Sequence, residues 1–222
     1  MAPINATLGD LARSTPAATH VFMRHRLDFC CGGKRTLAEA CARAGLDPSA
    51  ILAEIAAAAE QGDQPATWDG RSQAELVDHI EQRYHASLRR DLPGLIEAAR
   101  RVERVHASHP AVPAGLADVL VGFAAELERH MRKEETVLFP MLRRGARGEA
   151  VYMPVRVMES EHDTHAECLV VIRELTGDLT LPPEACATWT ALYTGLETLE
   201  ADLMQHIHLE NNVLFLRATR EG

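Results

Sequence analysis

The sequence contains the same pattern of potential metal ligands twice. The pattern is His-x-x-x-Glu-x-x-Val-Leu-Phe, and it occupies residues 130–139 and residues 206–215. A further histidine precedes each copy at almost the same interval: His85 lies 45 residues before the first copy, and His162 lies 44 residues before the second. Imidazole and carboxylate groups are ligands for transition metals. The duplication therefore indicates one metal site built from two similar halves.

The candidate ligands are four histidines and two glutamates: His85, His130, Glu134, His162, His206 and Glu210. If both carboxylates and an oxo or hydroxo group bridge two metal ions, about ten of twelve octahedral positions are filled and about one stays open on each ion. Imidazole and carboxylate donors without thiolate favour iron or manganese over structural zinc. Of these two metals, iron would add redox and small-molecule chemistry that manganese performs less readily.

A single histidine–glutamate pair four residues apart has a simpler interpretation, a hydrogen-bonded pair on a helix, and a metal-free bundle with such pairs is the alternative. The surroundings of the pairs argue against it, because they interrupt an apolar helix face. In the second long segment the residues of this face are Leu116, Leu120, Phe123, Leu127, His130, Glu134, Val137 and Met141. A lone imidazole or carboxylate in such a face costs several kcal/mol unless a partner compensates. Shared metal ions would compensate all six groups.

Helix signals run along the whole chain, and strand signals are nearly absent. Capping boxes at Thr36–Glu39 and Ser72–Glu75 mark two helix starts. We expect short helices at about 8–13, 16–25, 37–44 and 48–61, and long helices at about 72–106 (kinked at Pro93-Gly94), 116–144, 154–175 and 183–218. The predicted fold is all-α: a small helical domain at residues 1–60, a linker at 61–71, and an antiparallel four-helix bundle at 72–222.

Composition excludes several classes of function. The net charge of −9 disfavours binding to nucleic acid. No apolar run of about 18 residues suggests a membrane span, and residues 1–9 lack the features of a secretory signal, so we expect a cytoplasmic protein. Five cysteines cannot all pair within the chain, and their spacing does not fit a small disulfide scaffold.

Two of the cysteines, Cys30 and Cys31, are adjacent in a glycine-containing turn, residues 28–33 (DFCCGG). The glycines would leave the sulfurs accessible, and Lys34 and Arg35 could stabilise thiolates. Adjacent cysteines bridge each other only with strain, so the pair suits redox exchange or transient metal binding better than a resting disulfide. The alternative is a buried pair with a packing role. We expect the remaining cysteines to be packing residues: Cys41, Cys168 and Cys186.

Several other polar residues lie near the candidate ligands in the sequence. Because His208 is about 200° from His206 around the helix, we expect it to face away from the metals, and His79 to lie off the face of His85. His165 shares the face of His162, so it is either a core residue or a hydrogen-bond partner of a ligand. Glu126 and Glu161 could also bond a ligand. The remaining histidines fall outside the pattern: His20, His25, His106 and His109.

Four segments around the candidate ligands resemble the hemerythrin-like core of the di-iron "repair of iron centres" proteins: residues 83–85 (RYH), 130–135 (HMRKEE), 159–163 (ESEHD) and 210–215 (ENNVLF). Residues 28–34 (DFCCGGK) resemble the short cysteine domain of the same family. The resemblance implies that the four histidines bind two irons and that Glu134 and Glu210 bridge them. It also implies a cytosolic dimer that restores iron–sulfur clusters damaged by nitrosative or oxidative stress.

Three functions are compatible with these features. The first is an iron donor whose partners are damaged iron–sulfur proteins, with Cys30 and Cys31 receiving iron or contacting the partner. The second is a hemerythrin-like carrier or sensor of oxygen or nitric oxide without any delivery role. The third is an enzyme that reduces nitric oxide at the di-iron site. Iron that is lost to a chelator on reduction would favour the first function over the second.

Overall fold

The computed structural model describes residues 4–60, 68 and 70–220. Within these ranges the chain is helical and contains no β-strand, only an isolated antiparallel bridge between Thr7 and Thr36. The expected linker at 61–71 falls mostly outside the described residues. None of the described helices is long and apolar enough to cross a lipid bilayer.

The N-terminal residues form a small helical unit, called the head below. Its helices are α1 (Leu8–Ser14), α2 (Ala17–Arg24), α3 (Leu37–Ala44) and α4 (Pro48–Glu60). The capping box predicted at Thr36 and Glu39 is present and starts α3. Apolar side chains from all four helices share one core, which includes Phe22, Phe29 and Ile51. The head therefore has a hydrophobic core of its own.

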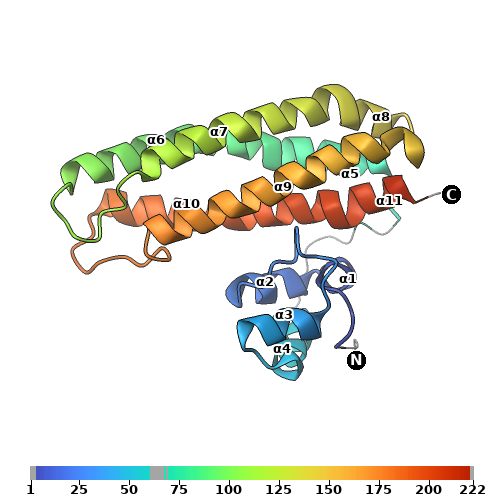
Figure 1. Cartoon of the computed structure of the whole chain (residues 1–222), viewed down its shortest axis with the longest axis horizontal. Coiled ribbons are helices and arrows are strands. Elements are labelled where there is room, and N and C mark those ends of the chain that lie inside the picture. Colours follow the sequence, from blue (N-terminus) through green and yellow to red (C-terminus); the bar gives the residue numbers. More distant parts are fainter. Residues whose placement is uncertain (1–3, 61–67, 69, 221–222) are drawn as a thin grey trace.

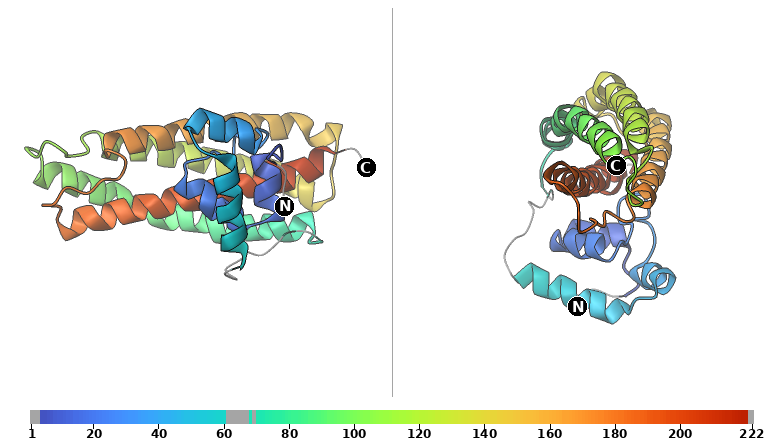
Figure 2. Two further views of the ribbon diagram at one scale, coloured as in Figure 1. Left: turned by 90° about the horizontal axis from the view of Figure 1, so that it is seen from below. Right: turned by 90° about the vertical axis from the view of Figure 1, so that its left-hand side faces the viewer.

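Four antiparallel rods form the bundle that follows (Figure 1). Three of the rods contain a π-helical turn between two α-helices. The rods are α5 (Gln73–His79), η1 (Ile80–His85) and α6 (Ala86–Val105); α7 (Leu116–Lys133), η2 (Glu134–Leu138) and α8 (Phe139–Arg143); α9 (Glu149–Leu175); and α10 (Ala187–Leu209), η3 (Glu210–Leu214) and α11 (Phe215–Thr219). Seen end-on, the rods surround a common interior (Figure 2). This confirms the predicted all-α fold with a four-helix bundle.

Two of the helix starts predicted near prolines differ from the starts in the structure. The third long helix begins at Glu149 rather than near Pro154, which lies inside α9. The fourth begins at Ala187 rather than near Pro183. Because proline is tolerated in the first turn of a helix, a proline in the sequence can resemble a helix start. Pro93 also lies inside a helix, since α6 continues from Ala86 to Val105.

The predicted inward face of the second rod was wrong beyond Glu134. Val137 was expected inside but is 52% exposed, whereas Leu138 and Leu142 are buried. Met141 is only partly buried. The cause is the π-helical turn η2, which adds a residue to the turn and moves the inward face by one position.

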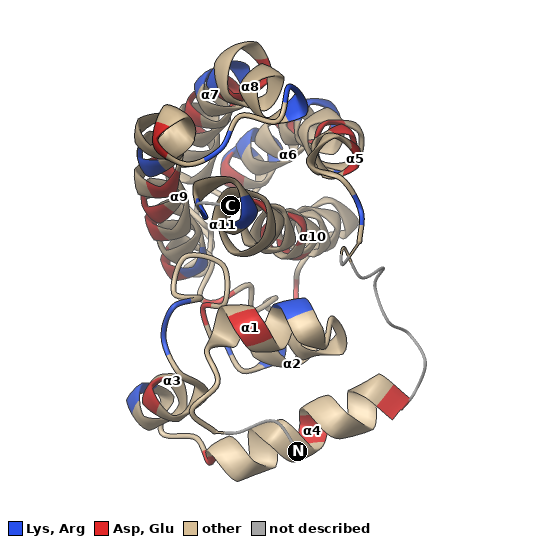
Figure 3. Cartoon of the chain, turned by 90° about the vertical axis from the view of Figure 1, so that its right-hand side faces the viewer, with Lys and Arg blue, Asp and Glu red and all other residues tan. Residues whose placement is uncertain are grey.

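The head lies against α9, α10 and η3 of the bundle, with α1 and α2 nearer to it than α3 and α4 (Figures 1 and 3). Asn212 in η3 donates hydrogen bonds from its amide nitrogen to the backbone oxygens of Phe29 and Cys30, at 3.0 and 3.2 Å. An ion pair between Arg26 and Asp178 adds a second attachment. The cysteine-containing turn of the head is therefore held against the bundle.

Candidate metal centre

The structure brings the six predicted ligands together inside the bundle. They form two sets of four, and the donor atoms of each set lie within 4.8 Å of one another. The sets are His85, Glu134, His206 and Glu210, and His130, Glu134, His162 and Glu210. All six side chains are 2% exposed or less. Both carboxylates belong to both sets, so each could contact a cation held in either set.

The local geometry of each histidine pair fits one cation. The Nε2 atoms of His85 and His206 are 3.2 Å apart, and those of His130 and His162 are 3.0 Å apart. Two imidazole nitrogens at right angles on one metal, each about 2.1 Å from it, would be about 3.0 Å apart. The observed separations therefore match two ligands of a common ion.

The two carboxylates connect the pairs. Glu134 Oε2 lies 3.4 Å from the Nε2 atoms of both His85 and His130. The oxygens of Glu210 divide between the sets: Oε1 is 2.9 Å from His206 Nε2, and Oε2 is 3.1 Å from His162 Nε2. Neither oxygen of Glu134, nor Oε2 of Glu210, has a hydrogen-bond partner. A buried carboxylate without hydrogen bonds is costly, so this donor set fits a bound cation.

Contacts outside the cavity orient the imidazoles. His85 Nδ1 lies 2.8 Å from Glu135, which also binds Arg89. His130 Nδ1 lies 2.9 Å from Glu161. With Nδ1 donating to a carboxylate, Nε2 keeps its lone pair for a metal. The sequence analysis named Glu161 as a possible hydrogen-bond partner of a ligand. It did not identify Glu135, which adjoins the predicted ligand Glu134 and lies off the apolar face.

A third contact of this kind links the centre to the head. His162 Nδ1 is 2.8 Å from Asn211 Oδ1, and Asn211 Nδ2 donates to the backbone oxygen of Cys30 at 3.3 Å. One amide side chain therefore touches a candidate metal ligand and the cysteine turn. Sequence reasoning missed Asn211, although it directly follows Glu210.

The charges in the cavity favour bound cations. Burial lowers the pKa of His85, but the carboxylates of Glu134 and Glu135 beside it outweigh burial and raise the pKa to about 9. The pKa of His130 is raised to about 9 in the same way, with Glu134 opposing the effect of burial. The histidines in turn lower the pKa of Glu210 in spite of its burial. Without a metal, protons on His85 and His130 supply positive charge beside the carboxylates.

Two further histidines are buried close to the centre. The ring of His165 is 4.8 Å from that of His130, and its Nδ1 has no hydrogen-bond partner. Burial lowers the pKa of His165 to about 3, so it is neutral. His208 belongs to neither set of four and packs against Phe29 of the head, with 5.6 Å between the rings.

The other candidates lie elsewhere. His79 packs between Trp68 and Tyr84, and Glu126 pairs with Arg129. The remaining histidines are found in the head, where His20 is exposed and His25 pairs with Glu54, and near Trp189 at the far end of the bundle, where His106 and His109 lie.

The cysteine turn differs from its expected exposure. Cys30 is 4% exposed and buried, and Cys31 is partly exposed. Their sulfurs are 3.9 Å apart and unbonded. The expectation that the glycines leave both sulfurs accessible was therefore wrong for Cys30, because the head packs this turn against the bundle. Cys41 is buried, as expected for a packing residue, while Cys168 and Cys186 are partly exposed.

Comparison with known proteins agrees with these features. Residues 76–218 match the hemerythrin HHE cation binding domain, and residues 4–59 match the ScdA_N family, described as a domain of unknown function (DUF542). The iron-sulfur cluster repair protein YtfE of Citrobacter koseri is 52% identical over 211 residues, which are 95% of each chain. The protein of the same name from Escherichia coli O157:H7 is 51% identical over 218 residues, 98% of each chain. The resemblance found in the sequence is confirmed: the chain belongs to the hemerythrin HHE family, in the group that also carries an N-terminal ScdA_N domain.

Proposed function

We propose that this protein holds two non-haem irons and donates iron to iron–sulfur clusters damaged by nitrosative or oxidative stress. The observation that carries the proposal is the pair of buried four-residue sets that share both carboxylates. The relatives match this chain along nearly their whole length and are named iron-sulfur cluster repair proteins, which supports the same function.

Each ion would be held by one histidine pair and both glutamates. His85 and His206 would bind one ion, and His130 and His162 the other. This set contains no thiolate, and imidazole with carboxylate suits iron. A bound pair of irons supplies redox chemistry and sites where nitric oxide or oxygen species can bind.

The protein residues around the centre control charge and access. Glu134 and Glu210 place two negative charges where the cations bind, and their complete burial excludes water from those oxygens. Glu135, held by Arg89, and Glu161, held by Lys133, each fix one imidazole. Four neutral imidazoles and two carboxylates leave two ferrous ions with excess positive charge in a buried site. This incomplete neutralisation favours release of iron to a stronger acceptor.

The experiment is an iron transfer assay with purified full-length protein. Loaded protein is reduced and mixed with an iron–sulfur protein whose cluster has been destroyed by nitric oxide, and recovery of the cluster is followed by its absorbance. We expect about two irons per chain and cluster recovery. His206→Ala should lose iron binding and cluster recovery, while the exposed control His20→Ala should keep iron binding and cluster recovery. Protein that retains its iron against a chelator after reduction, and restores no cluster, would instead be a carrier or sensor. Conversion of nitric oxide to nitrous oxide by the reduced protein would make it a nitric oxide reductase.

We further propose that Cys30 and Cys31 take part in repair. Cys31 Sγ is 3.4 Å from the backbone oxygen of His162, so the thiol pair lies beside a candidate metal ligand. A Cys30→Ala, Cys31→Ala double variant should bind iron normally and restore clusters more slowly. Full repair activity in this variant would contradict the role.

The remaining expectations rest on the family resemblance. We propose a homodimer that works in the cytosol on damaged iron–sulfur proteins. Light scattering on the iron-loaded protein should give twice the chain mass of 24.4 kDa, and a monomer mass would contradict the dimer.

A further inference from the structure

A second cluster of metal-binding side chains lies in the turn of the head. Asp28 Oδ1 is 3.3 Å from Cys30 Sγ, and Cys30 Sγ is 3.9 Å from Cys31 Sγ. One donor atom from each of the three residues lies within 4.8 Å of the other two. This cluster shares no residue with the two sets in the bundle.

The spacing of the sulfurs matches thiolates on one ion. With metal–sulfur bonds of about 2.3 Å and tetrahedral angles, two thiolates lie about 3.8 Å apart. The observed 3.9 Å is close to this value, whereas a disulfide needs about 2.05 Å. A carboxylate oxygen on the same ion would lie about 3.6 Å from a sulfur, and Asp28 Oδ1 is within 0.3 Å of that distance from Cys30. Small side-chain rotations would complete three ligand bonds.

The backbone holds these donors in place. Asp28 Oδ1 accepts a hydrogen bond from the Cys31 backbone N–H at 3.0 Å, which folds the carboxylate back over the turn. A Cβ atom at Gly32 would lie only 2.6 Å from the Asp28 backbone oxygen and 2.8 Å from Oδ2. Only glycine fits there, so Gly32 permits the carboxylate to reach the cysteines. Asn212 fixes the same turn to the bundle.

A divalent cation would offset the negative charge that this cluster acquires when its thiols lose their protons. The neighbouring Cys31 thiol, burial and the charge of Asp28 all raise the pKa of Cys30. Two thiolates and a carboxylate this close repel one another unless a positive ion lies among them. Binding of a divalent metal would replace the two thiol protons and release them to solvent.

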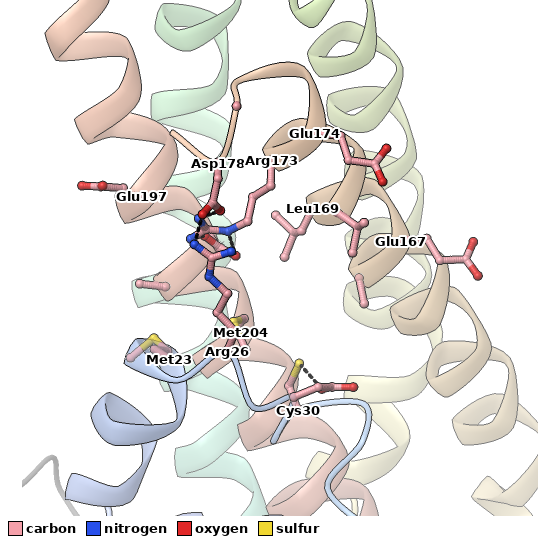
Figure 4. A pocket seen from close by; sticks show the side chains of 16 residues that line it. Met23, Arg26, Cys30, Glu167, Leu169, Arg173, Glu174, Asp178, Glu197 and Met204 are labelled. Atoms are coloured by element: carbon pink, nitrogen blue, oxygen red, sulfur yellow. Dashed lines mark hydrogen bonds and ion pairs between the residues drawn. The ribbon is translucent and has the colours of Figure 1, made fainter. Parts of the chain in front are cut away.

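The cluster is also open to exchange. A pocket of about 100 Å³ is lined by both cysteines together with Lys34, Glu159 and Asp163. Cys30 also forms one end of a larger cavity of about 810 Å³ between the head, α9 and α10, shown in Figure 4. Three protein ligands leave a fourth tetrahedral position for solvent or an incoming ligand, which is typical of a site that is not purely structural.

We propose that Asp28, Cys30 and Cys31 form a third metal site, separate from the dinuclear centre, for a single thiophilic divalent cation, ferrous iron in the cell. The site lies next to the centre, because Cys31 Sγ touches the backbone of His162 and Asn211 links His162 to Cys30. If the proposed function holds, this site is where iron leaving the bundle is bound before transfer. No electron is exchanged in this step: two thiol protons leave as the ion binds.

The test uses Co²⁺ as a spectroscopic probe with full-length, iron-loaded, reduced protein under anaerobic conditions. We expect one equivalent to bind with sulfur-to-cobalt charge-transfer absorption and the strong visible bands of tetrahedral Co²⁺. Cys30→Ser with Cys31→Ser should abolish the charge-transfer absorption. Asp28→Asn, whose amide oxygen can still accept the Cys31 N–H, should weaken Co²⁺ binding at least about tenfold. Cys168→Ser is the matched control and should bind as the wild type does.

The iron content and circular dichroism of each variant establish that the fold and the dinuclear centre are intact. Co²⁺ that binds without sulfur absorption, or with absorption that survives the double variant, would overturn the proposal. His206→Ala separates the third site from the proposed function, because it should lose cluster repair and still bind Co²⁺ at the turn. Repair activity without Co²⁺ binding at the turn would contradict the third site alone.

Discussion

We predict that His208 makes the attachment of the head to the bundle sensitive to acid. Its side chain is 2% exposed, packs against Phe29, and has Nδ1 3.2 Å from the amide nitrogen of Asn212, where it accepts a hydrogen bond. Burial, and then the charge of Arg13, lowers the pKa of His208 from its ordinary value of 6.5 to about 4. Protonation would place an unpaired charge in the interface and remove the acceptor that Asn212 uses.

The lowered pKa sets the size and sign of the effect. The unfolded chain binds this proton with a pKa near 6.5, so the contribution of His208 to stability is complete above that pH and is lost as the pH falls toward 4. At 1.36 kcal/mol for each pH unit between the two pKa values, the whole loss is about 3 kcal/mol, and about 2 kcal/mol of it has occurred by pH 5.

The measurement is urea unfolding of wild-type protein and His208→Gln at pH 7 and pH 5. Glutamine cannot take up a proton and its oxygen can accept from Asn212. Between pH 7 and pH 5 the free energy of unfolding should therefore fall by about 2 kcal/mol less in the variant than in the wild type. The contributions of other titrating groups cancel in this comparison. His20→Gln, at an exposed position of α2, should behave as the wild type does. Equal losses in wild type and His208→Gln would refute the reasoning.

Two further substitutions test the centre and the bundle. Glu135→Gln removes the charge that holds His85 Nδ1, so ferrous iron should bind about 10–100-fold more weakly in competition with a chelator; wild-type affinity would show that the contact does not tune the ligand. Leu138→Ala should lower the free energy of unfolding by about 2–5 kcal/mol, whereas Val137→Ala should change it by about 0.5 kcal/mol or less; denaturant unfolding of both variants checks the inward face, and a reversed order would restore the regular α-helical register.

Much of the centre could be predicted from the sequence because its signal is duplicated. The six candidate ligands stood out as polar residues that interrupt apolar helix faces at matching intervals, and the structure brings them together. The capping boxes at Thr36–Glu39 and Ser72–Glu75 are both present and locate the starts of α3 and α5. These features depend on residues close together in the sequence or on a repeated spacing, which a single sequence displays.

Other parts could not be predicted because they depend on contacts across the fold. Glu135 and Asn211 lie off the apolar faces that identified the ligands, and only the packing of neighbouring rods shows what they touch. The burial of Cys30 depends on how the head meets the bundle. In the sequence Asp28 has the features of an ordinary turn residue, and only the structure shows its carboxylate beside the two sulfurs.

The π-helical turns connect these observations, since three of the four rods contain one at the level of the centre. His85 ends η1, while Glu134 and Glu210 begin η2 and η3; α9, which carries His162, remains α-helical from Glu149 to Leu175. Such turns are less favourable than α-helix and occur frequently at functional sites. Here apolar clusters on both sides of the ligands hold the turns in place. This apolar packing therefore helps to set where the π-helical turns place His85, Glu134 and Glu210 along their rods.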